Sequence, residues 1–153
     1  MSTQTHTLTI WNNTILGQLE SRTFKFGKAR DTGSNDKLVN NVKLTDLGYE
    51  RNMVYGWIDT AIGNIRAAFP KYAGAVRTSN SGELKRTELD FVLSSKWDSR
   101  NGMGFDNDCK EYIVNKVISD FLSLSMPREA DLYAAKAMQA LKDAERKLYY
   151  KTA

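Results

Sequence analysis

The fold is decided by residues 111–151, EYIVNKVISDFLSLSMPREADLYAAKAMQALKDAERKLYYK. Apolar residues recur at helical spacing on both sides of a short break at Ser123–Pro127. The break carries a serine and a proline, and a proline fits the first turn of a new helix. Because two helices joined so briefly pack against each other, this stretch predicts a C-terminal antiparallel helical hairpin.

The second helix of this hairpin has an unusual end. Its apolar stripe consists of Tyr133, Ala137, Ala140, Leu141, Ala144 and Leu148. Small residues predominate there, so a neighbouring helix can lie close. The basic residues Arg146, Lys147 and Lys151 complement the helix dipole. Neither feature explains the paired tyrosines Tyr149 and Tyr150, and we predict that residues 149–153 form a C-terminal tail.

Upstream, the hydrophobic period changes from that of a helix to that of a strand. Residues 89–94, LDFVLS, alternate in the way typical of a half-buried strand. Residues 72–78 are a candidate partner, joined through the turn formers SNSGE, so we expect a β-hairpin within residues 71–94 with Lys85 and Arg86 at its tip. Residues 96–108, KWDSRNGMGFDND, are expected to be a loop because two glycines and short polar side chains break any period.

A long helix is expected before the β-hairpin. Thr45 and Asp46 supply the chemistry of a helix N-terminus, and Pro70 marks the end. The apolar stripe between them consists of Leu47, Val54, Trp57, Ile58, Ala61, Ile62, Ile65, Ala68 and Phe69. The helix also contains three glycines near one side: Gly48, Gly56 and Gly63. They indicate either the close approach of another backbone or simple tolerance.

The first 43 residues predict less regular structure. Residues 1–9 are polar and lack the apolar segment of a secretory signal. Apolar residues at helical spacing predict a short amphipathic helix from Thr9 to Arg22. Residues 23–43, rich in glycine, serine, aspartate and lysine, are expected to be a long loop or arm.

These elements predict one domain over residues 1–153, because a chain of 153 residues suits a single core. The expected fold class is mainly α, a small helical bundle with a C-terminal antiparallel helical hairpin and an inserted β-hairpin. No apolar run approaches the roughly 20 residues that a membrane helix needs, so no membrane partner is expected. The net charge is +4, and the one clearly basic region is residues 66–86, where five basic residues face only Glu83.

The sequence offers little for catalysis. A single cysteine and a single histidine exclude an intrachain disulfide and argue against a zinc site. His6 lies in the polar N-terminal segment with no aligned carboxylate nearby in sequence, and a helical cysteine such as Cys109 is more often packed than reactive. Asp106, Asp108 and Glu111 suit a helix N-terminus for dipole reasons alone. We therefore expect no catalytic, cofactor-binding or metal-binding residue, and no enzyme.

Aromatic and basic residues are the better candidates for binding. Trp97, Tyr149 and Tyr150 are candidate interface residues because tyrosine and tryptophan are enriched where proteins meet; the alternative is that they fold back on their own core. The hairpin residues Arg77, Lys85 and Arg86, with Lys71 and Arg66, can contact phosphates. An alternative function is therefore that of a small basic DNA-associated or regulatory protein that uses the 71–94 hairpin.

Two stretches together carry a family resemblance: LDFVLSSKWD, and then the helical hairpin EYIVNKVISDFLSLSMPREADLYAAKAMQALKDAERKLYYK. This combination resembles small neck proteins of tailed bacteriophages and prophages, especially those of Bacteroides-type hosts. The likeness covers residues 89–151, and the long helix before Pro70 fits it loosely. It rests on the pattern of elements and not on a unique signature.

The resemblance implies a structural virion protein, a head-to-tail connector (adaptor) assembled in the host cytoplasm. Such subunits form a homo-oligomeric ring, commonly a dodecamer, beneath the portal and next to other neck or tail proteins. The segment Leu148, Tyr149, Tyr150 and Lys151 would then dock on the portal protein. Arg77, Lys85 and Arg86 would contact neighbours or non-specific DNA in the channel, and residues 23–43 would be an arm between subunits.

Overall fold

The computed structural model describes residues 2–30, 48–123 and 125–149, with side chains described outside 23–30 and 48–50. The elements are, in chain order, β1 (Thr3–Trp11), α1 (Asn12–Arg30), α3 (Gly48–Ala68), β2 (Ala73–Ser79), the short 3-10 helix η1 (Gly82–Leu84), β3 (Arg86–Ser94), the short 3-10 helix η2 (Ser99–Asn101), α4 (Gly102–Leu122) and α5 (Pro127–Tyr149). The described residues thus form four α-helices and a three-stranded antiparallel sheet. The prediction of a mainly α fold is confirmed.

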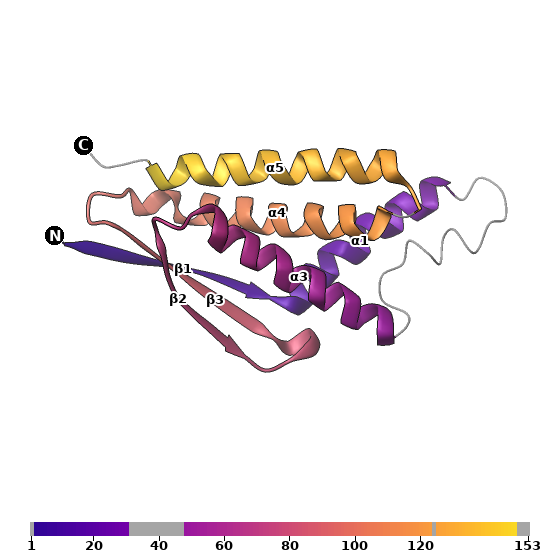
Figure 1. Ribbon diagram of the computed structural model, residues 1–153, viewed down its shortest axis with the longest axis horizontal. Coiled ribbons are helices and arrows are strands. Elements are labelled where there is room, and N and C mark those ends of the chain that lie inside the picture. Colours follow the sequence, from indigo (N-terminus) through magenta and orange to yellow (C-terminus); the bar gives the residue numbers. More distant parts are fainter. Residues whose placement is uncertain (1, 31–47, 124, 150–153) are drawn as a thin grey trace.

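Helix α4 is the centre of the helical layer. It buries residues on most of its sides, and α5 runs back along it in the opposite direction (Figure 1). The alanines Ala137, Ala140 and Ala144 of α5 are buried, and the hydroxyl of Ser119 on α4 donates a hydrogen bond to the carbonyl oxygen of Ala130 at 2.8 Å. Small side chains therefore allow the close packing of these two helices that the alanine stripe predicts.

The sheet has the strand order β1-β3-β2, so β3 is central. In β3, Thr87, Leu89, Phe91 and Leu93 are buried toward the helices. The antiparallel register places Leu8 opposite Leu89, so β1 contributes to the same buried face. The other face of the sheet carries exposed or half-buried side chains, as is common for antiparallel sheets.

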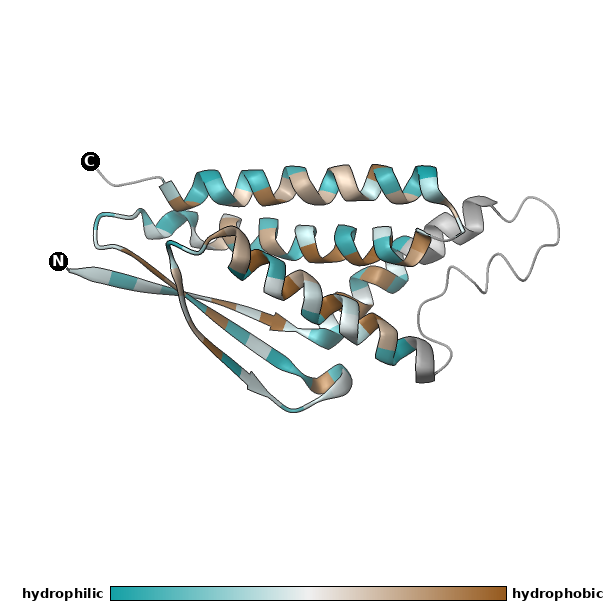
Figure 2. Ribbon diagram, in the orientation of Figure 1, coloured by the Kyte–Doolittle hydropathy of each residue, from teal (hydrophilic) through white to brown (hydrophobic). Residues whose placement is uncertain are grey.

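The core lies between the two layers, where the hydrophobic sides of helices and strands face each other (Figure 2). Its centre is an aromatic cluster in which Phe91 lies 5.0 Å from Phe105 and 6.3 Å from Phe69 between ring centroids. All three side chains are buried. Burial of a side chain of this size contributes about 1.5 to 3 kcal/mol of hydrophobic stabilisation, so this cluster joins α3, β3 and α4.

The N-terminal prediction is wrong in its element boundaries. Residues 3–11 form a strand and not a polar tail, and the helix begins at Asn12 instead of Thr9. The physical reason is the alternation TQTHTLTI, which turns Leu8 and Ile10 toward the core. The sheet therefore has a third strand beside the two that lie within the predicted 71–94 hairpin.

The prediction of a loop over residues 23–43 is wrong for its first part. Helix α1 continues to Arg30, through the segment TFKFGKAR. Residues 31–43 lie outside the described part of the chain, as do the predicted capping residues Thr45 and Asp46.

The prediction of a loop over residues 96–108 is wrong for its second half, because α4 begins at Gly102. A Cβ atom added at Gly102 would lie 2.8 Å from Cε1 of His6, and one at Gly104 would lie 2.9 Å from Cε of Lys147. These glycines let β1 and the end of α5 approach the first turn of α4. Glycine at these two positions therefore allows close packing between elements and does not interrupt the helix.

The glycines of α3 behave differently. A Cβ atom added at Gly56 or Gly63 would meet no heavy atom within 4 Å. In the described part of the structure, no other backbone comes close to Gly56 or Gly63. Of the two alternatives, simple tolerance of glycine therefore applies at these two positions.

Candidate protein-docking site

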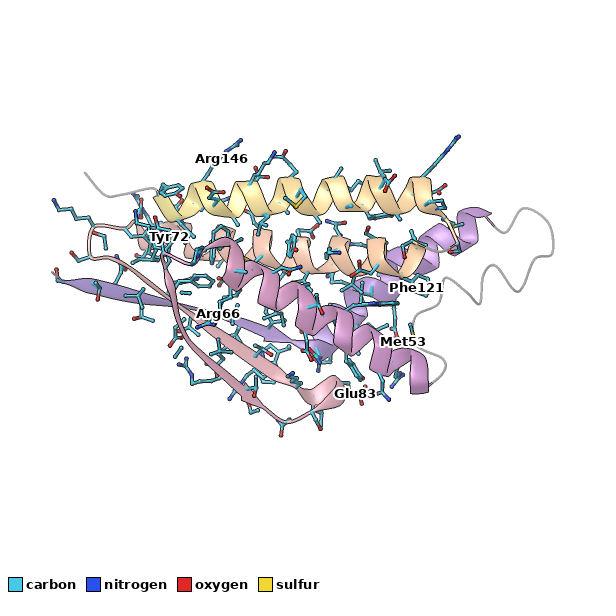
Figure 3. All side chains as sticks on the ribbon, viewed as in Figure 1. Met53, Arg66, Tyr72, Glu83, Phe121 and Arg146 are labelled. Carbon is cyan, nitrogen blue, oxygen red and sulfur yellow. The ribbon has the colours of Figure 1, made fainter. Side chains whose placement is uncertain are left out.

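A groove lies at the C-terminal end of α5 and has a volume of about 500 Å³. We call it the C-terminal groove. It is lined by Ser2, Thr3, Lys71, Tyr72, Val92, Leu93, Ser94, Trp97, Leu148 and Tyr149. These residues come from the start of β1 with the residue before it, from the α3–β2 connection, from β3 with the segment after it, and from α5. Figure 3 shows Tyr72 beside the end of α5. The fold thus brings together three residues that the sequence predicts at the site: Trp97, Leu148 and Tyr149.

Trp97 forms a wall of this groove from inside the core. Only 4% of the residue is exposed, and its indole N–H donates a hydrogen bond to the carbonyl oxygen of Lys147 at 2.8 Å. Of the two alternatives for Trp97, the structure therefore shows the one in which this side chain folds back on its own core. Its contact with Lys147 fixes the position of the last turn of α5.

Tyr149 is the exposed aromatic residue of the groove. It is 54% exposed, and its ring makes an edge contact with Tyr72 at 6.1 Å between centroids. Burial, followed by the neighbouring Tyr149, raises the pKa of the Tyr72 hydroxyl. The pair therefore presents apolar ring area with hydroxyl groups at the edge, a combination that protein interfaces favour.

The predicted tail, residues 149–153, is wrong at its first residue. Helix α5 continues through Tyr149, and Leu148 is buried in the core. Leu148 is therefore not part of a free docking segment, because its side chain is already packed within the protein. Tyr150 and Lys151 lie outside the described residues.

Polar contacts connect the elements that form the groove. The side-chain amide of Gln4 donates hydrogen bonds to the carbonyl oxygens of Ser94, at 3.0 Å, and Trp97, at 2.8 Å. The ammonium group of Lys147 binds the carboxylate of Asp108. These contacts join β1, the segment after β3, α4 and α5, so the groove is built on fixed elements.

His6 is the residue whose position the sequence reasoning missed. It lies in β1, and its Nε2 is 2.7 Å from Oδ1 of Asp106 on α4. Its ring contacts Trp97 and Phe105, with centroids 5.4 and 5.8 Å away. The signal in the sequence is the alternation of TQTHTLTI, which predicts a strand and therefore a fixed histidine. The pair attaches β1 to α4.

Cys109 lies one turn of helix from this pair but is fully buried. Burial raises the pKa of its thiol well above its usual range, and the nearby carboxylates of Asp106 and Asp108 add to this effect. A thiolate nucleophile is therefore disfavoured at this position.

The three carboxylates near the start of α4 each have a different basic partner. Asp106 contacts His6, Asp108 binds Lys147 and Glu111 binds Arg22. Across the ranges that the structure describes, no group of three or more histidine, cysteine or acidic side chains is arranged to hold a metal ion. The carboxylates therefore act as attachment points for β1, α5 and α1.

Arg77 lies in β2, Lys85 lies between η1 and β3, and Arg86 is the first residue of β3. All three residues form ion pairs within the chain. Arg77 binds Asp90 through two hydrogen bonds of 2.6 and 2.8 Å, which hold the pKa of Asp90 below its usual range. Lys85 lies 3.1 Å from a carboxylate oxygen of Asp59. Arg86 pairs with Glu88 at 3.4 Å and lies over the ring of Trp11.

These contacts offset much of the positive charge of the hairpin. The structure therefore separates the predicted contacts into two places. The aromatic residues meet at the C-terminal groove, whereas the basic residues of the hairpin lie elsewhere on the sheet.

Comparison with protein-family models, with curated proteins and with solved structures found no match to this chain. Within the described ranges, no helix combines the length and the apolar character that crossing a membrane requires. Any functional conclusion therefore depends on the residues and on their arrangement.

Proposed function

We propose that the protein is a structural, non-enzymatic subunit of the neck of a tailed phage, a ring-forming adaptor that joins the portal to the tail around the DNA channel. The observation that carries the proposal is the C-terminal groove, with the exposed Tyr149 and its partner Tyr72 at the point where the chain continues into residues 150–153. A groove of this size with exposed aromatic side chains suits the docking of another protein.

In this proposal the α4–α5 hairpin is the body of a small helical bundle, and the β2–β3 hairpin is an insertion on it. Tyr149, together with Tyr150 and Lys151, contacts the portal protein. Trp97 and Leu148 support this surface from the core instead of contacting the partner directly.

The hairpin residues Arg77, Lys85 and Arg86 contact a neighbouring subunit or the DNA. Their ion pairs leave dispersed charge on the hairpin, which favours DNA passing without tight binding.

The test is the assembly state of the full chain, alone and with the portal protein encoded in the same genome. We expect size-exclusion chromatography with light scattering to show a ring or a portal complex, and electron microscopy of particles to show the protein in the neck. Tyr149→Ala should weaken the portal complex by about tenfold, the usual effect of a contact of roughly 1.4 kcal/mol.

Met138→Ala is the matched control, because Met138 is an exposed apolar residue of the same helix that does not line the groove. The proposal is wrong if the chain stays monomeric with and without the portal and is absent from particles. A salt-dependent shift of labelled duplex DNA by the isolated protein would instead favour the DNA-associated alternative.

A further inference from the structure

A second groove lies between α3 and the open side of the sheet at β2, and we call it the α3–β2 groove. Its volume is about 330 Å³. It is lined by Asp59, Ile62, Gly63, Arg66, Val76, Thr78, Lys85, Thr87 and Leu89. Val76 is opposite Leu89 in the sheet and so belongs to its helix-facing side, yet it is 45% exposed because α3 does not cover it.

Thr87 lines this groove, but its hydroxyl oxygen is buried beneath the surface of the groove. The residue is only 4% exposed, and its hydroxyl oxygen has no hydrogen-bond partner in the described structure. A buried hydroxyl without a partner lowers the stability of the free protein. Because this oxygen is not accessible from the groove, the contacts of an occupant come from the other lining residues.

Strand β2 also offers an open edge. Among the described residues it pairs only with β3, and four of its seven residues, 75–78, are exposed. Edge strands are usually protected by lysine, proline or bulges. Here a bulge interrupts only the stretch from Ala73 to Val76, and the single charged side chain, Arg77, is held by Asp90. The stretch Val76–Ser79 can therefore accept another strand.

The charge of the groove is positive at one end. Lys85 is neutralised by Asp59 at the end near the hairpin tip. Arg66 donates a hydrogen bond to the carbonyl oxygen of Gly74 at 3.1 Å and has no carboxylate partner in the described part of the chain. Figure 3 shows Arg66 between α3 and the strands. The guanidinium is therefore available to an acidic group.

From the exposed Val76, the open edge of β2 and the available guanidinium of Arg66 we propose that the α3–β2 groove binds an extended segment of a partner protein, which pairs as an added strand with β2. The segment carries apolar side chains that cover Val76 and a carboxylate that pairs with Arg66. This binding mode does not depend on the neck assignment, because it rests on the groove alone.

The experiment uses the full chain and a displayed library of random peptides of about ten residues, long enough for one strand. Gly63→Trp is the blocking variant, since Gly63 lines the groove and has open space for a side chain. Gly56→Trp is its control, because it makes the same change on the same helix outside the groove lining. We expect selected peptides to alternate apolar residues and to carry an aspartate or glutamate. Their affinity should fall about tenfold or more in Gly63→Trp only.

Two further variants test the polar contacts. Arg66→Gln should weaken the selected peptides, and more so those with an acidic residue than their amide versions. Thr87→Val is the control for this variant: it should leave binding unchanged, because the hydroxyl is not accessible from the groove, and should leave the free protein equally or more stable, because the unpaired hydroxyl is gone. The proposal is overturned if no peptide is enriched over the Gly63→Trp protein, or if the enriched peptides lack an acidic residue. It is also overturned if the groove instead mediates self-association that Gly63→Trp abolishes.

Discussion

At the scale of single residues, Gly102 is the position with the least room for a side chain. Its missing side chain leaves room for the His6 ring, which is held between Trp97 and Phe105 and by Asp106. Gly102→Ala should destabilise the protein by about 1 to 3 kcal/mol, because a Cβ atom overlaps a ring that cannot move. Urea unfolding followed by circular dichroism measures this change.

Gly104→Ala is the control for this prediction. Its Cβ atom would meet the Lys147 side chain, which is flexible and can move at the expense of its contact with Asp108. The helix also gains up to about 1 kcal/mol in propensity, so Gly104→Ala should cost less stability than Gly102→Ala. Equal effects of the two substitutions would contradict the assigned role of the His6 ring.

The residues at these contacts show how far the sequence can lead. The alanine stripe of α5 predicts a close helical neighbour, and the buried Ala137, Ala140 and Ala144 confirm it. The pairing of His6 with Asp106 joins positions 100 residues apart, and no local pattern encodes such a contact. Gly102 and Gly104 are typical of a loop in the sequence, although both lie in helix α4. Glycine is present there because β1 and α5 pack closely against the first turn of this helix.

At the scale of elements, the largest difference between the sequence-based prediction and the structure is strand β1. Leu8 is fully buried in this strand, and Leu8→Ala should cost about 2 to 5 kcal/mol of unfolding free energy. If residues 1–9 were a polar tail, the same change would have little effect. Leu84→Ala is the matched control, since this exposed leucine should change stability by less than about 0.5 kcal/mol.

The boundaries of β1 and α1 could not be predicted from local spacing, because Ile10 and Ile15 suit both a strand and a helix. Their assignment depends on Asn12, whose backbone N–H donates to the carbonyl oxygen of Lys85 at 3.0 Å and whose side chain donates to that of Gly82 at 2.9 Å. These contacts with the hairpin tip fix the point where the strand ends and the helix begins. Tertiary structure therefore decides the boundary.

At the scale of the whole molecule, the two grooves are the two binding surfaces that we propose for this protein. The C-terminal groove includes Lys71 and Tyr72, and the α3–β2 groove includes Arg66 and Val76, so the two border the same connection between α3 and β2. The proposed ring assembly needs distinct surfaces of this kind for its neighbours and for its axial partners.

The C-terminus allows docking and folding to be separated. A chain that ends at Tyr149 keeps the buried Leu148 and the contact between Trp97 and Lys147. We expect its thermal unfolding to match that of the full chain while its complex with the portal protein weakens. A chain that ends at Lys147 also loses the Leu148 side chain from the core, and it should be less stable by about 2 to 5 kcal/mol. If instead the chain ending at Tyr149 binds the portal as tightly as the full chain, residues 150–153 take no part in docking, and Tyr149 alone must carry the contact.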